Sequence, residues 1–123
     1  MNFNDIFSSY ILGDGDILSF RLDYELRQFA VKLKARRLLA KQKFEPCQIE
    51  LEFNEVLELY FFEDFPTNGG YTDVTFVKLG AEGFYLSLDP YGNTGMPHEE
   101  DNLVIKAGAL TLIDEEGIRQ NIS

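Results

Sequence analysis

The feature of this sequence that most constrains its fold is the alternation of apolar and polar residues on either side of an acidic loop, within residues 84–107. Every second residue from Phe84 to Leu88 is apolar before the loop, and every second residue from Leu103 to Ala107 is apolar after it. A period of two places successive side chains on opposite faces of a strand, whereas a helix has a period of 3.6. The stretch therefore predicts two β-strands.

The same pattern recurs along the chain, in residues 18–24, 29–36, 48–53, 56–62, 71–79 and 109–113. The sequence contains 11 Phe and 6 Tyr but no Trp, and aromatic side chains are favoured on pleated, half-buried surfaces. We predict a mostly β protein, with an antiparallel β-sandwich or open barrel of about six to eight strands.

Residues 25–43 also fit a helix. Leu26, Phe29, Ala30, Leu33 and Ala40 would share one helical face, and the Ala, Lys, Arg and Leu content favours a helix. We favour a hairpin in which residues 29–36 form the second strand, with the helix as the alternative.

A length of 123 residues suits a single domain spanning residues 1–123. Within it we expect residues 1–16 to be a weakly patterned lead-in that ends in a turn at residues 13–16, and residues 114–123 to be a polar tail. The residues on the inward parity of the strands form the predicted core: Phe20, Leu22, Val31, Leu33, Leu51, Phe53, Phe76, Leu86, Leu88 and Ile105.

The chain carries a single cysteine, Cys47, so it has no internal disulfide. Its first residues include acids where a signal peptide has a positive region, and no apolar run reaches the roughly 20 residues that span a bilayer. These features predict a soluble, cytoplasmic protein.

The formal net charge is −10, which argues against nucleic acid or an anionic membrane as a partner. Residues 21–43 contain eight bases and two acids, whereas sixteen acids and three bases follow from residue 44 onward. One interpretation is that a basic strand lies beside acidic ones, with Lys32 and Lys34 opposite Glu50 and Glu52. The other is that the acidic part is a surface for a basic protein partner.

No complete catalytic, metal-binding or nucleotide-binding motif is present, and we expect no catalytic residue, metal or cofactor. Asp14 and Asp16 begin an EF-hand-like spacing, but Ser19 stands where that loop requires glycine. A cysteine–histidine pair would need Cys47 and His98, and Cys47 shares the inward parity of its strand, which favours a buried, unreactive thiol. Paired carboxylates for hydrolysis remain open among 21 acids.

Two segments combine aromatic and acidic residues and are the candidate binding surface. The first is the run 60–65 at the end of a predicted strand, whose alternative role is to fill the core from both sides of a central strand. The second is the loop 89–101, for which a solvated loop is the alternative. The candidate binding residues are Tyr60, Phe62, Glu63, Asp64, Asp89, Tyr91, His98, Glu99, Glu100 and Asp101.

The segments GDGDILSFRLDYELRQFAVKLKAR, QIELEFNEVLELYFFEDF and FYLSLDPYG, followed by EEDNLVIKAGALTL, occur in this order over about 100 residues. This arrangement resembles a loosely defined group of small bacterial proteins, some of which are immunity proteins found beside polymorphic toxins. The resemblance implies a β-rich, cytoplasmic binding protein without catalysis.

The sequence thus predicts a non-catalytic, cytoplasmic protein-binding module, such as an immunity protein that neutralises a basic toxin. A small-ligand-binding or hydrolytic enzyme that uses the loop Asp89 to Asp101 is an alternative. A self-associating structural domain, which forms a homodimer, is another.

Overall fold

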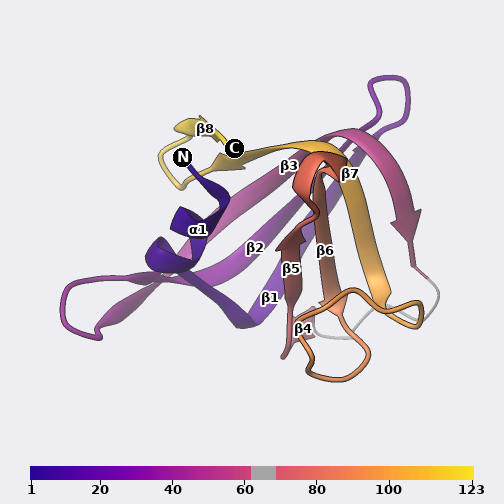
Figure 1. The fold of residues 1–123 in the computed structure, drawn as a ribbon. Coiled ribbons are helices and arrows are strands. Elements are labelled where there is room, and N and C mark those ends of the chain that lie inside the picture. The colour runs from indigo at the N-terminus through magenta and orange to yellow at the C-terminus, as the bar shows by residue number, and fades with distance from the viewer. Residues whose placement is uncertain (62–68) are drawn as a thin grey trace.

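A computed structural model describes residues 1–61 and 69–123, in which the chain forms a curled β-sheet and one short α-helix (Figure 1). Strands account for 59% of the described residues, which confirms the prediction of a mostly β fold. The elements are α1 (Phe3–Ser9), β1 (Tyr10–Asp23), β2 (Gln28–Leu38), β3 (Phe44–Tyr60), β4 (Gly70–Tyr71), β5 (Thr75–Lys78), the 3₁₀ turn η1 (Gly80–Glu82), β6 (Phe84–Asp89), β7 (Asn102–Ile113) and β8 (Arg119–Asn121).

The strands pair in the order β4-β1-β2-β3-β7-β6-β5, with β8 also on β7, and all pairs are antiparallel. The two ends of this order, β4 and β5, are separated in the chain by residues 72–74 alone. Because so short a link cannot cross a flat sheet of this width, the sheet curls until its edges approach each other. The result is a half-barrel, so of the two predicted architectures the open barrel is the one formed.

The core fills the concave side of the half-barrel, and α1 lies beside its mouth (Figure 1). Phe3 of α1 packs edge to face against Phe76, with ring centroids 4.8 Å apart. The predicted core residues that are buried are Val31, Leu33, Leu51, Phe53, Phe76, Leu86, Leu88 and Ile105.

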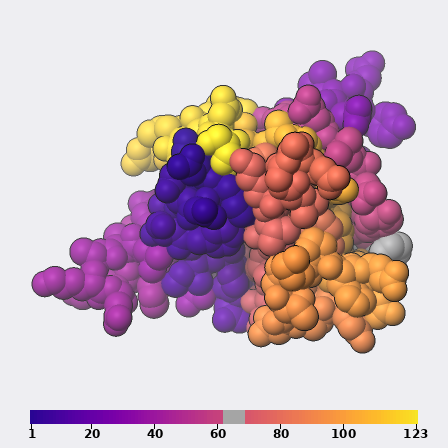
Figure 2. Space-filling model, viewed as in Figure 1, coloured from indigo at the N-terminus to yellow at the C-terminus, as the bar shows by residue number. Residues whose placement is uncertain are grey.

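Two predicted core residues of β1 differ from this pattern. Leu22 is 53% exposed, and Phe20 is partly buried at the edge of the core, with its ring 5.5 Å from that of Phe29. Leu22 pairs with Phe29 on the expected face. However, it lies near the tip of the β1–β2 hairpin, which projects beyond the elements that cover the core (Figure 2). The sequence therefore predicted the correct face of β1 for Leu22, but the prediction that other elements bury this side chain was wrong.

Residues 28–38 form β2, so the helix alternative for residues 25–43 is wrong. β2 pairs with β1 on one edge and β3 on the other, and its inward residues Phe29, Val31, Leu33 and Ala35 are buried. Tertiary burial of this alternating set outweighs the helical propensity of the Ala, Lys and Arg residues between them.

The basic strand does lie beside acidic residues, but not in the expected register throughout. Lys32 is opposite Glu50 as predicted, whereas Lys34 is opposite Gln48. Glu52 is buried and accepts a hydrogen bond from the Arg119 guanidinium.

The chain ends are more structured than predicted. The expected lead-in holds α1 and the first part of β1, and residues 13–16 form an irregularity within β1 rather than a turn before it: Asp14 has φ 54° and donates its N–H to the Thr72 carbonyl oxygen at 2.8 Å. The expected polar tail contains β8, and Ile122 is 8% exposed.

The middle of the chain also departs from the prediction. The stretches 48–53 and 56–60 belong to one long strand, β3, in which Glu55 has φ 56° and a register shift lies between Val56 and Glu58. Residues 103–107 and 109–113 likewise belong to one strand, β7. Leu57 is 53% exposed, so β3 is not covered on both faces there. Among residues 1–61 and 69–123, no helix has the length and apolar character needed to cross a membrane.

Candidate binding site

Strand β6 is buried on both faces, although only one face contacts the apolar core. Its outward residues Tyr85 and Ser87 are 7% and 0% exposed. The Ser87 hydroxyl donates a hydrogen bond to the Asn102 carbonyl oxygen at 2.6 Å, and the Tyr85 hydroxyl donates one to the Asp101 carboxylate at 2.6 Å. The loop after β6 therefore folds back over the outer face of the sheet.

The Asp101 carboxylate fastens this loop to β6. Asp101 is 2% exposed, and its Oδ2 accepts hydrogen bonds from the Tyr85 hydroxyl and from the His98 N–H, the latter at 2.9 Å. Its Oδ1 accepts the Tyr91 N–H at 2.7 Å. A buried carboxylate is tolerated because several donors replace the water it has lost. These bonds fix both ends of residues 91–98.

Burial raises the pKa of Tyr85 well above its ordinary value of 10.0, and the hydrogen bond to the adjacent Asp101 carboxylate raises this pKa further. The Tyr85 hydroxyl consequently stays protonated over the neutral range, where it donates to Asp101. It is a fixed donor in the wall of the site rather than a proton acceptor.

The outer side of the loop is held by an aromatic contact. The rings of Tyr91 and His98 stack with centroids 4.5 Å apart, and the Glu100 N–H donates to His98 Nδ1 at 3.0 Å. Gly92 and Gly95 both have φ 73°, a conformation that a side chain would strain. The loop thus takes its shape from two glycines, one stacked pair and one buried carboxylate.

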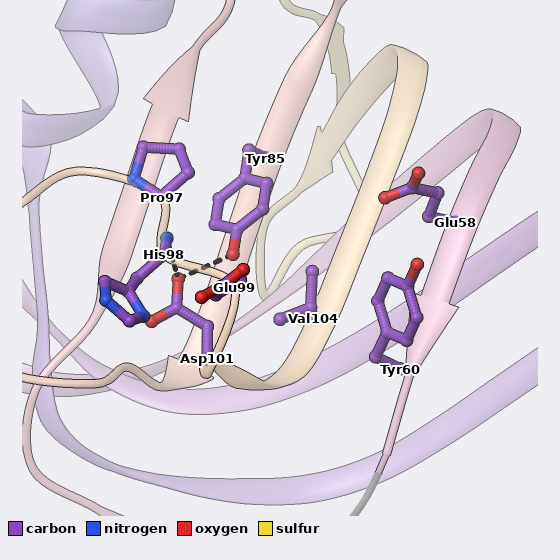
Figure 3. Close-up of a pocket in the computed structure, with 8 residues that line it drawn as sticks. All are labelled: Glu58, Tyr60, Tyr85, Pro97, His98, Glu99, Asp101 and Val104. Atoms are coloured by element: carbon purple, nitrogen blue, oxygen red, sulfur yellow. Dashed lines mark hydrogen bonds between the residues drawn. The ribbon is translucent and has the colours of Figure 1, made fainter.

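A hollow of about 430 Å³ lies between this loop and the end of β3. Figure 3 shows Glu58 and Tyr60 on one side of Val104, with Tyr85 and Asp101 on the other. The residues lining the hollow are Glu58, Tyr60, Tyr85, Pro97, His98, Glu99, Asp101 and Val104.

Glu58 and Tyr60 lie on the outer face of β3. The register shift between Val56 and Glu58 brings Glu58 opposite Lys106 and Tyr60 opposite Val104. Lys106 is in turn opposite Tyr85, and residues directly opposite each other on neighbouring strands share a face of the sheet. Glu58 and Tyr60 therefore lie on the same side of the sheet as Tyr85.

The hollow is acidic. Three of its lining residues are carboxylic acids and none is a lysine or arginine; the closest base in the strand register is Lys106, opposite Glu58. Among residues 1–61 and 69–123, no ion pair involves Glu58 or Glu99. Together with Tyr60, these carboxylates suit a cationic group that also presents apolar surface.

The structure brings four of the candidate binding residues together and separates others from them. Tyr60, His98, Glu99 and Asp101 line the hollow. Asp101 is buried there and holds the loop, whereas Asp89, Tyr91 and Glu100 are exposed beside the hollow. The candidates Phe62, Glu63 and Asp64 lie outside the described residues.

Sequence reasoning missed the lining residues Glu58, Tyr85, Pro97 and Val104. Glu58 could have been found from its parity, because it precedes Tyr60 by two residues and shares its face. Tyr85 could have been found only in part: alternation placed it on the outer face, but nothing local indicated that a loop would cover it.

Cys47 is 2% exposed, as its parity predicted, and burial raises its thiol pKa. The thiol therefore stays protonated and enclosed. Within the described part of the chain, no group of three or more His, Cys, Asp or Glu residues could hold a metal ion.

No protein-family model matches the sequence, and comparison with curated proteins and with solved structures finds no significant match. The chemistry of the site is therefore argued from its own geometry.

Proposed function

We propose that this protein is a non-catalytic binding module for a basic protein, and that the hollow between β3 and the loop 90–101 is part of its binding surface. The observation that carries the proposal is the lining of the hollow, where Glu58, Glu99 and Tyr60 surround a space that no lysine or arginine lines. A basic side chain with an apolar stem fits such a lining, since it offers a counter-charge to the carboxylates and a contact surface to the ring.

The negative charge of Glu58 and Glu99 supports the choice of a basic partner. The carboxylates of Glu50 and Glu52 are met by Arg21 within the chain, at 3.1 and 3.7 Å. Glu58 and Glu99 lie away from that cluster, and Glu99 is exposed. Carboxylates that form no ion pair among residues 1–61 and 69–123 can attract a basic surface and speed its association.

The same geometry makes an enzyme the weaker candidate. The Asp101 carboxylate is already engaged by three donors, and His98 Nδ1 already accepts the Glu100 N–H. A general base needs a free acceptor directed at the substrate. Asp101 and His98, two groups in the loop that could perform acid–base chemistry, are instead used to hold the loop in place.

Neutralisation of a basic toxin in the cytoplasm, as an immunity protein would perform it, is a role in which this surface would act directly. The toxin would be bound tightly and held away from its substrate. Fast, charge-steered association followed by slow release is the kinetic behaviour that such a role requires.

The test uses a partner captured from the native host, with binding kinetics measured at low and high salt. Glu58→Gln and Glu99→Gln should each slow association by roughly a factor of 3 to 10, and added salt should slow association of the unaltered protein. Tyr60→Ala should instead speed dissociation, because a buried aromatic contact acts on residence time. Glu82→Gln, at an exposed carboxylate in η1, is the matched control and should change neither rate.

An acidic partner would contradict the proposal. So would association that is indifferent to salt and to both changes in the hollow, because the carboxylates would then serve solubility alone.

A further inference from the structure

A second hollow, the hairpin groove, lies between the tip of the β1–β2 hairpin and the second half of β3. It has a volume of about 630 Å³ and is lined by Leu22, Tyr24, Glu25, Arg27, Val56, Leu57, Glu58 and Leu59. Leu22 and Leu57 are each 53% exposed and Tyr24 is 87% exposed. Large apolar side chains gathered in this way on a surface mark a site of association.

The hairpin groove runs beside the second half of β3, which pairs with β7 on one edge. The pairing of β2 with β3 ends at Phe29 and Phe53. Beyond it, the Val56 N–H donates to the Arg27 carbonyl oxygen at 3.0 Å, and Arg27 Nη2 donates to the Val56 carbonyl oxygen at 2.8 Å.

Among the described residues, β2 and β3 have no register pair beyond Phe29 and Phe53. Within the described part of the chain, the strand pairing of Glu58 and Leu59 is with β7 only. In an antiparallel strand, alternate main-chain groups point to the opposite edge. Main-chain donors and acceptors of β3 therefore face the groove, where an added strand would find them.

The charges that line the hairpin groove indicate which kind of molecule it would bind. Glu25 and Glu58 line the groove, and its one base, Arg27, is engaged with the Val56 carbonyl oxygen. A second copy of the chain, paired through the same edge, would bring two Glu58 residues together and would join two molecules of net charge −10. The groove therefore favours an apolar segment with basic ends.

We propose that the hairpin groove binds an extended, apolar segment of the partner, with lysine or arginine at its ends, which adds as a strand to β3 along residues 57–59. This inference rests on the proposed function, because Glu58 lines both the groove and the first hollow, so one basic partner would occupy both. Main-chain pairing supplies part of the affinity, and Leu22 and Leu57 receive alternate side chains of the segment.

The test uses the full chain, labelled with ¹⁵N, and a short peptide of alternating valine and threonine with a lysine at each end. Amide signals of residues 22–27 and 56–60 should shift on titration, and those of the β5 edge should not. The same peptide with alternate backbone nitrogens methylated should bind at least about tenfold more weakly, because it cannot form the pairing bonds. A version with glutamate at both ends should also bind more weakly.

Leu57→Ser should weaken binding of the lysine-ended peptide about tenfold, because it removes an apolar contact from the groove. Leu39→Ser is the matched control: Leu39 is 45% exposed at the opposite hairpin, and its replacement should leave the affinity unchanged.

Three results would overturn the inference. The methylated peptide could bind as well as the parent, the shifts could fall at β5, or sedimentation could show a dimer that Leu57→Ser dissociates, which would make the groove a homodimer contact. If the peptide fails but partner association still responds to Glu99→Gln and Tyr60→Ala, strand addition is wrong and the proposed function stands. If neither response occurs, both are wrong.

Discussion

Two acidic regions on the outer face of the sheet differ in how their charge is balanced. Across β1, β3 and β8, Glu52 is buried and lies between Arg21 and Arg119 of the same chain. At the end of β3, Glu58 and Glu99 line a hollow without an ion pair among the described residues. The first region uses its charge to join strands, and the second leaves its charge for a partner.

The comparison shows that net charge alone does not locate a binding surface. The total of −10 includes carboxylates that are neutralised within the fold and others that are not. Only the second group can steer a partner, so changes in the two regions should have opposite consequences for stability and for binding.

The largest expected effect comes from the core beneath both regions, which sets the scale for the others. Leu51 and Leu86 are both 0% exposed, and replacing either with alanine should lower the free energy of unfolding by about 2 to 5 kcal/mol. Urea denaturation followed by circular dichroism would measure this loss. Unchanged midpoints for both variants would mean that the assignment of the inward face is reversed.

The next largest effect is expected where the binding region meets the sheet, at Asp101. Asp101→Asn keeps the shape of the side chain but weakens its bonds to Tyr85, Tyr91 and His98, and should lower the free energy of unfolding by about 1 to 3 kcal/mol. Hydrogen exchange should become faster at the Tyr91 and His98 amides before it does so at core amides. If these amides exchange as in the unaltered protein, Asp101 does not hold the loop.

Because the pKa of Tyr85 is raised, the free energy of unfolding should depend on pH in the alkaline range. The unfolded chain releases the phenolic proton near pH 10.0, whereas the folded protein retains it to a higher pH. The stabilisation is therefore fully present below pH 10.0 and is lost progressively as the pH rises above that value.

Denaturation midpoints at pH 9 and pH 11 should show this loss, and Tyr85→Phe should reduce the difference between them. Tyr24→Phe, at a residue 87% exposed, should leave the difference unchanged. An equal loss in Tyr85→Phe and the unaltered protein would assign the alkaline effect to other groups, of which Tyr71 is the first candidate because burial also raises its pKa.

The smallest expected changes in the free energy of unfolding compare the two acidic regions directly, one at Glu52 and the other at Glu58 and Glu99. Glu52→Gln should lower the free energy of unfolding by about 1 kcal/mol, a modest value because its arginine partners are more than half exposed. Glu58→Gln and Glu99→Gln should change it by less than about 0.5 kcal/mol. If the ranking is reversed, the charge of the hollow is structural and the comparison is wrong.

Alternation predicted much of this fold because the core side of each strand has a simple signal. The buried sets of β2, β3 and β6 follow the parity read from the sequence, and Cys47 follows it too. Leu22 also has the expected parity but is exposed, because its burial depends on how far the hairpin projects, which parity does not encode. The helix before β1 was missed because only Phe3 and Ile6 of α1 are buried, too few to form a pattern.

The site was less predictable than the fold for a physical reason. His98, Glu99 and Asp101 are close together in sequence, but Glu58 and Tyr60 reach them only through the pairing of β3 with β7 after a bulge. The role of Asp101 was also hidden, because a buried anchor and an exposed binding carboxylate look alike in a polar loop. The distinction depends on three donors that the fold supplies.

The most direct measurement of the central claim is to map the surface that a basic partner covers, by following amide signals of the ¹⁵N-labelled protein as unlabelled partner is added. The account predicts changes at Glu58, Tyr60 and Glu99, and none at residues 39–43 of the opposite hairpin. Changes confined to the Arg21–Glu52–Arg119 region or to the opposite hairpin, with the hollow unaffected, would contradict it.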